Sequence, residues 1–533
     1  MKKIYETIMA TAGGNSWAFP GIRRRLVICS VFLLVILFAG TQQVNAAILG
    51  MDRASYGVWD REGGHPVGSY PYTRGQSCDL SWGAVNTARS NFTWTAIDSL
   101  LQIADDQNQM FTVKVSPIDG SAPGKSMPTW MFTSDVPKII CPSYTYGYYL
   151  DPEFKIYFSE MVTAFAKHVR QDVASNLQSR IAFVRVDTGC TGDEAPYEGT
   201  DVPYVPTSPT NYQISASAWK NYRLWVFELY RHAFQDGPGP VIPLLFQSVE
   251  PPQFQDEWNW VSSNIVGGVG IKHGSQLRGY QLTESESNVE VWKPLALDSD
   301  FKFFSRNEMD QTWKYYYFQL NLPLTMYWTA LEQLNVGMSI WDWSGTCLEA
   351  AVSSNMVFTA TLFNTWAAEL DPATARGGFC VFHDGLSSDD TSRFSVATYG
   401  SASKGNTARY TAICAAYSNQ GARMDHLVAA TWGSVAQRNP PPDGMNGFND
   451  SGWQIHPGNY DRFITQINPT NESMGLWRVR GTLTTSSHPY DRFARRFDRA
   501  SNKNAMRFDV NDHLTPTPGQ SIKLSVIYLD SGT

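Results

Sequence analysis

The sequence predicts an α/β protein whose main body is an eight-stranded parallel barrel. From about residue 48 to residue 371, short apolar runs typical of buried strands alternate with longer stretches that carry apolar residues at helical spacing. Repeated β-then-α units over this length require parallel strands with helices on the outside. An open sheet that binds a dinucleotide is disfavoured, because no Gly-x-Gly-x-x-Gly turn follows the first strand.

The two periodicities place the individual elements. The expected helix at 94–107 has Ile97, Leu101 and Ala104 on one side and leads into a β-rich run at 110–115. Further strands are expected at residues 181–186, 241–246, 269–272, 302–304 and 338–341. Further helices are expected at residues 152–168, 218–234, 256–265, 325–333 and 350–370, and the last of these closes the barrel domain, which covers residues 47–372.

The chain changes character after Pro372. Residues 373–438 hold a strand-like run at 379–382 and a helix-like run at 406–417, which predicts a small α/β extension packed on the barrel. A Pro-rich linker begins at Asn439. Residues 439–533 hold short β-like runs at 475–479, 505–510 and 521–529, which predict a β-sandwich accessory domain. The chain ends soon after the last run, which allows for the final strands to be missing.

The first 46 residues have the features of an export signal. Three arginines, Arg23 to Arg25, precede an apolar run from Leu26 to Phe38, and Val44-Asn45-Ala46 resembles a signal-peptidase site. The run is short for a membrane span. We therefore expect a secreted or periplasmic protein with no stable membrane span after cleavage. The alternative is a chain anchored through an uncleaved signal.

Composition favours a carbohydrate ligand over a nucleic acid. Aromatic residues make up 13% of the chain, with 18 Trp and 25 Tyr, and charged residues only 17%. Nucleic-acid binding needs dense Lys and Arg, and the net charge here is −7. Aromatic faces stack on sugar rings, although they also fill large cores. An acidic surface does not attract anionic polymers, so a sulfated or uronate substrate would need a local basic patch.

The cysteine pattern predicts neither a metal site nor a cofactor. No Cys-x-x-Cys pair occurs, so a zinc site is not expected. Export would permit disulfides, but the spacing leaves their pairing open. The cysteines beyond residue 46 are Cys78, Cys141, Cys190, Cys347, Cys380 and Cys414.

Carboxylates follow several predicted strands, at the barrel end where catalytic groups lie. Glu194 stands in a Gly-framed turn after the strand at 181–186, and Glu308 follows the strand at 302–304. With two barrel strands between residue 48 and the run at 110–115, these are the fourth and seventh strands of the barrel. Other acidic residues after strands are Glu250, Glu284 and Glu286. A solvated loop for Glu194, or a helix N-terminus for Glu308, is the alternative without catalysis.

This arrangement resembles the clan A glycoside hydrolases, which include family 42-type β-galactosidases and several algal-polysaccharide hydrolases. The resemblance implies that Glu194 is the acid/base, that Glu308 is the nucleophile and that Trp341 floors the sugar site. It covers residues 48–370 in architecture but only short motifs in sequence. The clan usually has Asn-Glu after strand four, whereas Asp193 precedes Glu194 here. Asp193 is expected to raise the pKa of Glu194 by charge repulsion.

Further residues near the two glutamates are candidate substrate contacts. Arg306, two residues before Glu308, is expected to keep that carboxylate ionised. A tyrosine, Tyr280 or Tyr327, is a candidate hydrogen-bond donor to the nucleophile. The full set of predicted substrate-binding residues is Asp193, Arg306, Asn307, Trp341, Tyr197, Tyr280 and Tyr327.

The expected function is a retaining glycosidase that cleaves β-glycosidic, first β-galactosidic, bonds of an extracellular poly- or oligosaccharide. Two carboxyl groups about 5 Å apart would retain the anomeric configuration, and a separation of about 6.5–9.5 Å would invert it. Two alternatives stay open. One is an inverting, β-amylase-like glucanase, and the other is a non-catalytic carbohydrate-binding protein on a degenerate barrel. The sequence does not specify sugar, linkage or oligomeric state.

Overall fold

The computed structural model describes residues 51–526 with gaps. The longer internal segments outside the described residues are 119–126, 203–210, 274–294, 296–302, 383–390, 413–458 and 479–492, and 191–194 is a shorter one. By its contacts the chain divides into residues 1–46 and residues 47–533, and the described residues all belong to the second unit. None of the described helices combines the length and hydropathy of a transmembrane segment.

Eight parallel strands close into a barrel, as the sequence predicts. Each strand pairs with its neighbour in chain order, and the last returns to the first, with Gly57 opposite Ile340. The strands are β1 (Gly57–Asp60), β2 (Gly75–Ser81), β3 (Met110–Ser116), β6 (Ile181–Arg185), β7 (Leu244–Gln247), β8 (Val269–His273), β9 (Phe303–Glu308) and β10 (Ile340–Trp343). In this order β6 is the fourth barrel strand and β9 the seventh.

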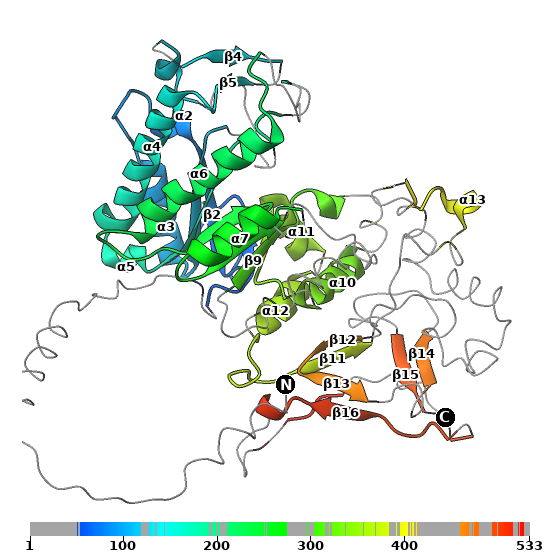
Figure 1. Ribbon diagram of the computed structural model, residues 1–533. Helices are drawn as coiled ribbons and strands as arrows, with labels where there is room; N and C mark the ends of the chain where they lie inside the picture. The colour runs from blue at the N-terminus through cyan, green and yellow to red at the C-terminus, as the bar shows by residue number, and fades with distance from the viewer. Residues whose placement is uncertain are drawn as a thin grey trace, which may run out of the picture. The chain divides into compact units, whose positions relative to one another are not determined.

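Helices cover the outside of the barrel (Figure 1). They are α2 (Trp82–Val85), α3 (Thr95–Asp106), α4 (Pro152–Lys167), α5 (Ser175–Gln178), α6 (Ala216–Gln235), α7 (Gln255–Asn264), α10 (Leu322–Asn335), α11 (Gly345–Ser353) and α12 (Val357–Trp366). Local sequence sets their ends. Asp151 caps α4 by accepting from the backbone N–H groups of Glu153 and Phe154, and Pro152 takes the first helical position.

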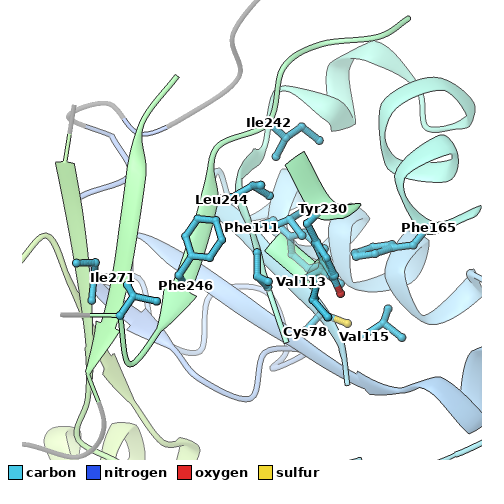
Figure 2. Close-up of a cluster of buried hydrophobic side chains, with 14 of the residues drawn as sticks. Cys78, Phe111, Val113, Val115, Phe165, Tyr230, Ile242, Leu244, Phe246 and Ile271 are labelled. Atoms are coloured by element: carbon cyan, nitrogen blue, oxygen red, sulfur yellow. The ribbon is translucent and has the colours of Figure 1, made fainter. Parts of the chain in front are cut away.

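Apolar side chains form an outer layer between strands and helices. Figure 2 shows part of it: Phe165 of α4 and Tyr230 of α6 lie with the strand residues Phe111 and Val113. These strand residues alternate with others that point into the barrel, because successive side chains of a strand face opposite sides. The outer layer therefore explains why the apolar runs were readable from the sequence.

The barrel interior is closed at its base by a second, smaller cluster of buried side chains. Its members are Trp59, Ala182, Phe183, Leu245, Phe304 and Ile340. Gly270 of β8 faces the same space: a Cβ there would come within 2.3 Å of the Phe304 ring. The missing side chain lets the aromatic ring fill the centre, so the barrel base is packed and not open.

Two elements of the barrel differ from the sequence-based expectation. Strand β9 continues to Glu308, four residues beyond the predicted end at Phe304. Its second half is polar, with Arg306 and Glu308 facing the barrel interior, and this polar run was interpreted as a loop. The predicted closing helix at 350–370 is two helices, α11 and α12, separated at Ser354. Serine and asparagine in that stretch compete for backbone hydrogen bonds and favour helix ends.

The region after the barrel contains antiparallel strand pairs. The strand predicted at 379–382 is β11 (Phe379–Phe382), which pairs with β12 (Asn459–Arg462), across the predicted boundary at residue 438. The other pairs are β13 (Ile464–Ile467) with β16 (Arg507–Val510), and β14 (Met474–Arg478) with β15 (Phe493–Arg496). These pairs do not establish the predicted β-sandwich.

The strand predicted at 521–529 is not confirmed where the chain is described. Ser521 and residues 523–526 are not in a strand. Leu524 and Val526 are 81% and 68% exposed, so the alternating pattern finds no sheet to pack against. The rest of that run, like most of the helix predicted at 406–417, lies outside the described residues.

Arg462, the last residue of β12, joins this region to the barrel helices. Its guanidinium donates to the carbonyls of Trp366 and Glu369, near the end of α12, at 3.3 and 2.6 Å. It also donates to the carbonyl of Leu334 in the last turn of α10. The carbonyls at a helix end lack partners within the helix, so this buried arginine satisfies them.

Candidate active site

The C-terminal ends of the eight strands meet at one mouth of the barrel, and Glu308 lies there. It is the last residue of β9, and it faces inward with Phe304 and Arg306, because alternate residues of a strand share a side. Its side chain is 12% exposed. A carboxylate is thus held at the mouth of the barrel, at the end of the seventh strand.

Two cations from other parts of the barrel bind this carboxylate, one on the adjacent strand β8 and one directly after β1. Lys272, on β8, places its Nζ 2.9 Å from Oε1 of Glu308, and Arg61, directly after β1, places its Nε 3.4 Å from the same oxygen. The Nζ of Lys272 also donates to Oε1 of Gln247 on β7, at 3.0 Å. Residues on β7, on β8 and directly after β1 therefore hold the carboxylate of Glu308, directly or through Lys272, in a defined place.

The charges around Glu308 keep it ionised. Burial acts to raise its pKa, but Lys272, Arg61 and Arg306 outweigh burial and hold the pKa well below the ordinary range of a glutamate. The expectation that Arg306 lowers the pKa of Glu308 therefore agrees with the structure, although Lys272 and Arg61 contribute more. An ionised carboxylate can stabilise a positive charge or attack a carbon; it cannot deliver a proton.

This depressed pKa predicts how stability depends on pH. The free energy of unfolding of the wild type minus that of Glu308→Gln should be constant from pH 7 to about 5. It should then shrink as the pH falls below about 4.3, the ordinary pKa of a glutamate. The stability that a carboxyl group with a depressed pKa contributes is lost as the pH falls from its unfolded-state pKa toward its folded-state pKa. Urea unfolding at each pH measures the difference. A difference that shrinks between pH 7 and 5 would contradict the assignment.

Arg306 lies beneath Glu308 and does not reach the mouth. It is fully buried, contacts Asp342 of β10 and has Nη2 3.4 Å from Oγ of Ser77 on β2. Burial raises the pKa of Asp342, against the effect of Arg306. The prediction that Arg306 binds substrate is therefore wrong: a second layer of charge separates the mouth from the packed base, and Arg306 belongs to it.

Asn307 and Trp341 point away from the barrel interior. Asn307 is buried, and its Nδ2 donates to Oε1 of Gln333 on α10 at 3.2 Å. Trp341 is fully buried in the outer layer, edge-on to Phe363 of α12 and to Trp343. Both occupy the outward-facing positions of their strands. Their predicted roles as a substrate contact and as the sugar floor are therefore wrong.

Two of the predicted tyrosines are also used in packing. The hydroxyl of Tyr197 donates to the carbonyl of Tyr212 at 2.7 Å, and its buried ring contacts Tyr146. Tyr327 is buried on α10, and its ring stacks on Phe358 of α12. Neither presents a free face to a ligand. The remaining predicted site residues, Glu194, Asp193 and Tyr280, and the rival carboxylates Glu250, Glu284 and Glu286, lie outside the described residues.

The loop after β6, which carries Glu194, is described on both sides of that residue. Before it, the backbone of Cys190 forms an isolated parallel β-bridge with that of Ile118, which follows β3. After it, Tyr146 of the hairpin strand β5 (Thr145–Gly147) holds the loop: its hydroxyl accepts from the backbone N–H of Glu198 at 3.0 Å and donates to Asp201 at 2.8 Å. Burial raises the pKa of Tyr146, so the hydroxyl keeps the proton that it donates.

Replacing Tyr146 tests whether this contact positions the loop. Tyr146→Phe removes one hydroxyl and leaves the partly buried N–H of Glu198 without its acceptor, so the unfolding free energy should fall by about 1–3 kcal/mol. Under the function proposed below, kcat should also fall, up to about tenfold, with little change in KM. Tyr148→Phe is the matched control, since the Tyr148 hydroxyl makes no hydrogen bond among the described residues. Equal effects of the two variants would contradict a positioning role.

Comparisons with known proteins assign the chain to no family. No protein family and no curated protein matches it. Three similar solved structures are xylanase 10B from Thermotoga petrophila RKU-1 in complex with xylobiose, the catalytic domain of β-amylase from Paenibacillus polymyxa, and xylanase B from Clostridium stercorarium F9. They are 9%, 10% and 12% identical to the chain, with TM-scores of 0.33, 0.36 and 0.31.

These matches cover 55–56% of this chain and 83%, 92% and 89% of the three proteins. Identities and TM-scores at this level carry no argument about what the chain does, and none of the three is a β-galactosidase. The eight-stranded barrel follows instead from the strand pairing of the chain itself.

The structure adds charged residues that the sequence reasoning missed. Besides Lys272 and Arg61, an inward group on the opposite side of the mouth contains Asp79 of β2, Lys114 of β3 and Asp187 after β6. Lys114 Nζ lies 3.1 Å from Oδ2 of Asp187 and 3.9 Å from Oδ2 of Asp79. The available signal was the alternation itself: Asp79 and Lys114 each stand between apolar neighbours, Cys78 and Leu80 in β2 and Val113 and Val115 in β3.

Proposed function

We propose that this chain is a retaining glycoside hydrolase that cleaves β-glycosidic bonds, with β-galactosides as the first substrates to test, in an extracellular poly- or oligosaccharide. Glu308 is the nucleophile, and Glu194 is the acid/base. One observation carries the proposal: an inward-facing carboxylate, kept ionised by Lys272 and Arg61, stands at the end of the seventh strand of a closed barrel.

The reaction would use the ionised carboxylate twice. In the first step the protonated Glu194 gives its proton to the leaving oxygen, while Glu308 attacks the anomeric carbon to form a glycosyl ester. In the second step Glu194 takes a proton from water, the water attacks that carbon, and Glu308 leaves as a carboxylate. Lys272 and Arg61 stabilise the carboxylate, so they favour its departure in the second step.

The place of Glu194 in the chain supports its proposed role as the acid/base. The strand before it, β6, is the fourth of the barrel, and the loop re-enters the described structure at Ala195, held by Tyr146 through Glu198. Export through residues 1–46 agrees with an extracellular substrate and stays part of the proposal.

A panel of β-linked polymers and aryl glycosides tests the function. The purified chain is incubated with galactan, xylan, mannan, algal polysaccharides and nitrophenyl β-glycosides, and released reducing ends are measured. Proton NMR of the first product separates retention from inversion. Turnover with retention supports the proposal. Inversion supports the β-amylase-like alternative, and no turnover of any substrate by folded protein contradicts a hydrolase.

A further inference from the structure

The side chain of Gln247 faces the barrel interior, above the packed base. Leu245, two residues earlier on β7, belongs to the base cluster, and alternate residues of a strand share a side. Oε1 of Gln247 accepts a hydrogen bond from Nζ of Lys272 at 3.0 Å, and the same Nζ lies 2.9 Å from Oε1 of Glu308. Gln247 and Lys272 are both buried. The ammonium group therefore lies between a neutral oxygen and a charged one.

The backbone at Gln247 is fixed from the helix layer. Nη2 of Arg223, on α6, donates to the carbonyls of Gln247 and Ser248 at 2.8 and 2.9 Å. Nη1 of Arg223 lies 3.3 Å from Oε1 of Glu257 on α7, and both side chains are buried. Ser248 has a φ of 52°, so the chain turns directly after Gln247. These contacts hold Gln247 in place independently of Lys272.

The proposed reaction removes the charged partner of Lys272. When Glu308 attacks the anomeric carbon, its carboxylate becomes an uncharged ester. Burial lowers the pKa of Lys272, and the negative charge of Glu308 acts against burial. A buried ammonium group without a counter-ion is unfavourable, so Lys272 loses its proton more easily in the ester state than in the free enzyme.

The other charged groups of the barrel interior do not replace this partner. Those that the structure describes are Arg61, Lys114, Arg185, Arg306, Asp79, Asp187 and Asp342. Each of the three aspartates pairs with an arginine or lysine other than Lys272. The cations Arg306 and Lys114 act to lower the pKa of Lys272. Gln247 is a neutral acceptor, so it keeps its contact with the ammonium group whatever the charge of Glu308.

We propose that Gln247 is a positioning residue for the second step: it holds the ammonium group of Lys272 in place while Glu308 is an ester, ready to receive the carboxylate as it leaves. In that step water attacks the anomeric carbon and Glu194 takes a proton from the water. The electron pair of the broken ester bond goes to Glu308. The inference rests on the proposed function, but the contact between Gln247 and Lys272 can be tested without turnover.

Titration of Lys272 by NMR tests this contact. The chain is labelled with [ε-13C]lysine, and Lys272→Met assigns the signal by its loss. Glu308→Gln provides an uncharged stand-in for the ester. In that background Gln247→Met should lower the titration midpoint of Lys272 by about one pH unit, because the buried ammonium group loses a hydrogen bond. Gln247→Glu, a second variant that keeps an oxygen there, should raise the midpoint. An unchanged midpoint in either variant would overturn the proposal.

Kinetics that separate the two steps test the role in the reaction. With a dinitrophenyl β-glycoside, whose first step is fast, kcat reports the second step and kcat/KM the first. The alkaline limb of kcat should lie about one pH unit lower in Gln247→Met than in the wild type, because Lys272 keeps its proton only to a lower pH. The loss of kcat there should reach about tenfold. The value of kcat/KM should stay within about twofold of the wild type.

The matched control is Gln235→Met. Gln235 is also buried, but it bonds Val266 and Ile242, which precede β8 and β7 at the other end of these strands. This variant should leave both constants and the alkaline limb unchanged. Equal losses of kcat and kcat/KM in Gln247→Met, without a shifted limb, would overturn the positioning role and leave the hydrolase assignment intact. A shifted Lys272 midpoint without turnover of any glycoside would overturn the hydrolase assignment instead.

Discussion

Glu308→Gln should lower kcat by about a thousandfold or more, because the amide can neither attack the anomeric carbon nor balance the positive charge that develops there. Glutamine keeps the shape of the side chain and still offers an oxygen to Lys272 and Arg61, which bind Oε1 of the wild-type carboxylate. Initial rates with the best nitrophenyl β-glycoside measure the loss, and circular dichroism checks the fold.

The matched control is Glu160→Gln, which makes the same chemical change on the outside of the barrel, where Glu160 pairs with Arg89 at 3.1 Å. Its kcat should equal that of the wild type. If Glu308 is the nucleophile, azide added to Glu308→Ala should restore cleavage of an activated glycoside and form a glycosyl azide of inverted configuration. A Glu308→Gln enzyme with more than about a tenth of the wild-type rate would end the nucleophile assignment.

Glu194→Gln should produce a loss that depends on the leaving group. For a natural oligosaccharide, whose leaving oxygen needs a proton, kcat should fall by about 10²–10⁴-fold. For a dinitrophenyl glycoside, which leaves without a proton, the first step should be nearly unaffected, so covalent intermediate accumulates and a burst of product appears. Stopped-flow absorbance of the released phenol measures both phases.

Glu198→Gln is the control for this loop. Glu198 is four residues after Glu194 in the chain and has no assigned part in the reaction. Its carboxyl oxygen Oε2 lies 3.5 Å from Sγ of Cys190. A loss for Glu194→Gln of the same size with both leaving groups would rule out acid catalysis by this residue. It would direct attention to the other carboxylates after the barrel strands.

The alternation of a strand explains what could be predicted from the sequence. Runs such as Phe111-Thr-Val113 were readable because their outward side chains are apolar and pack on helices. The inward positions of β9 are Phe304, Arg306 and Glu308, so the run changes from apolar to charged within one strand. Without neighbours in view, such a run has the composition of a loop. The predicted strand therefore stopped four residues early.

The same alternation explains the errors in the predicted site. Asn307 was predicted to bind substrate because it is next to Glu308 in the sequence. Trp341 was predicted because it is an aromatic residue at the end of the eighth strand. Both stand at outward positions, and helices α10 and α12 cover them. The residues that contact Glu308 come from other strands. Lys272 lies on β8, which pairs directly with β9, and only barrel closure brings Arg61 to the carboxylate. Pairing of this kind cannot be read from one strand at a time.

The position of Arg462 limits how the chain can be shortened. Proteolysis or gene truncation at Pro372 would keep all eight barrel strands but remove the guanidinium that satisfies carbonyls at the ends of α10 and α12. Of these helices, α12 contacts β10 and β1, which complete the cylinder, and α10 contacts β9. A barrel fragment intended for crystallisation or engineering should therefore extend at least through β12, with β11 as its partner.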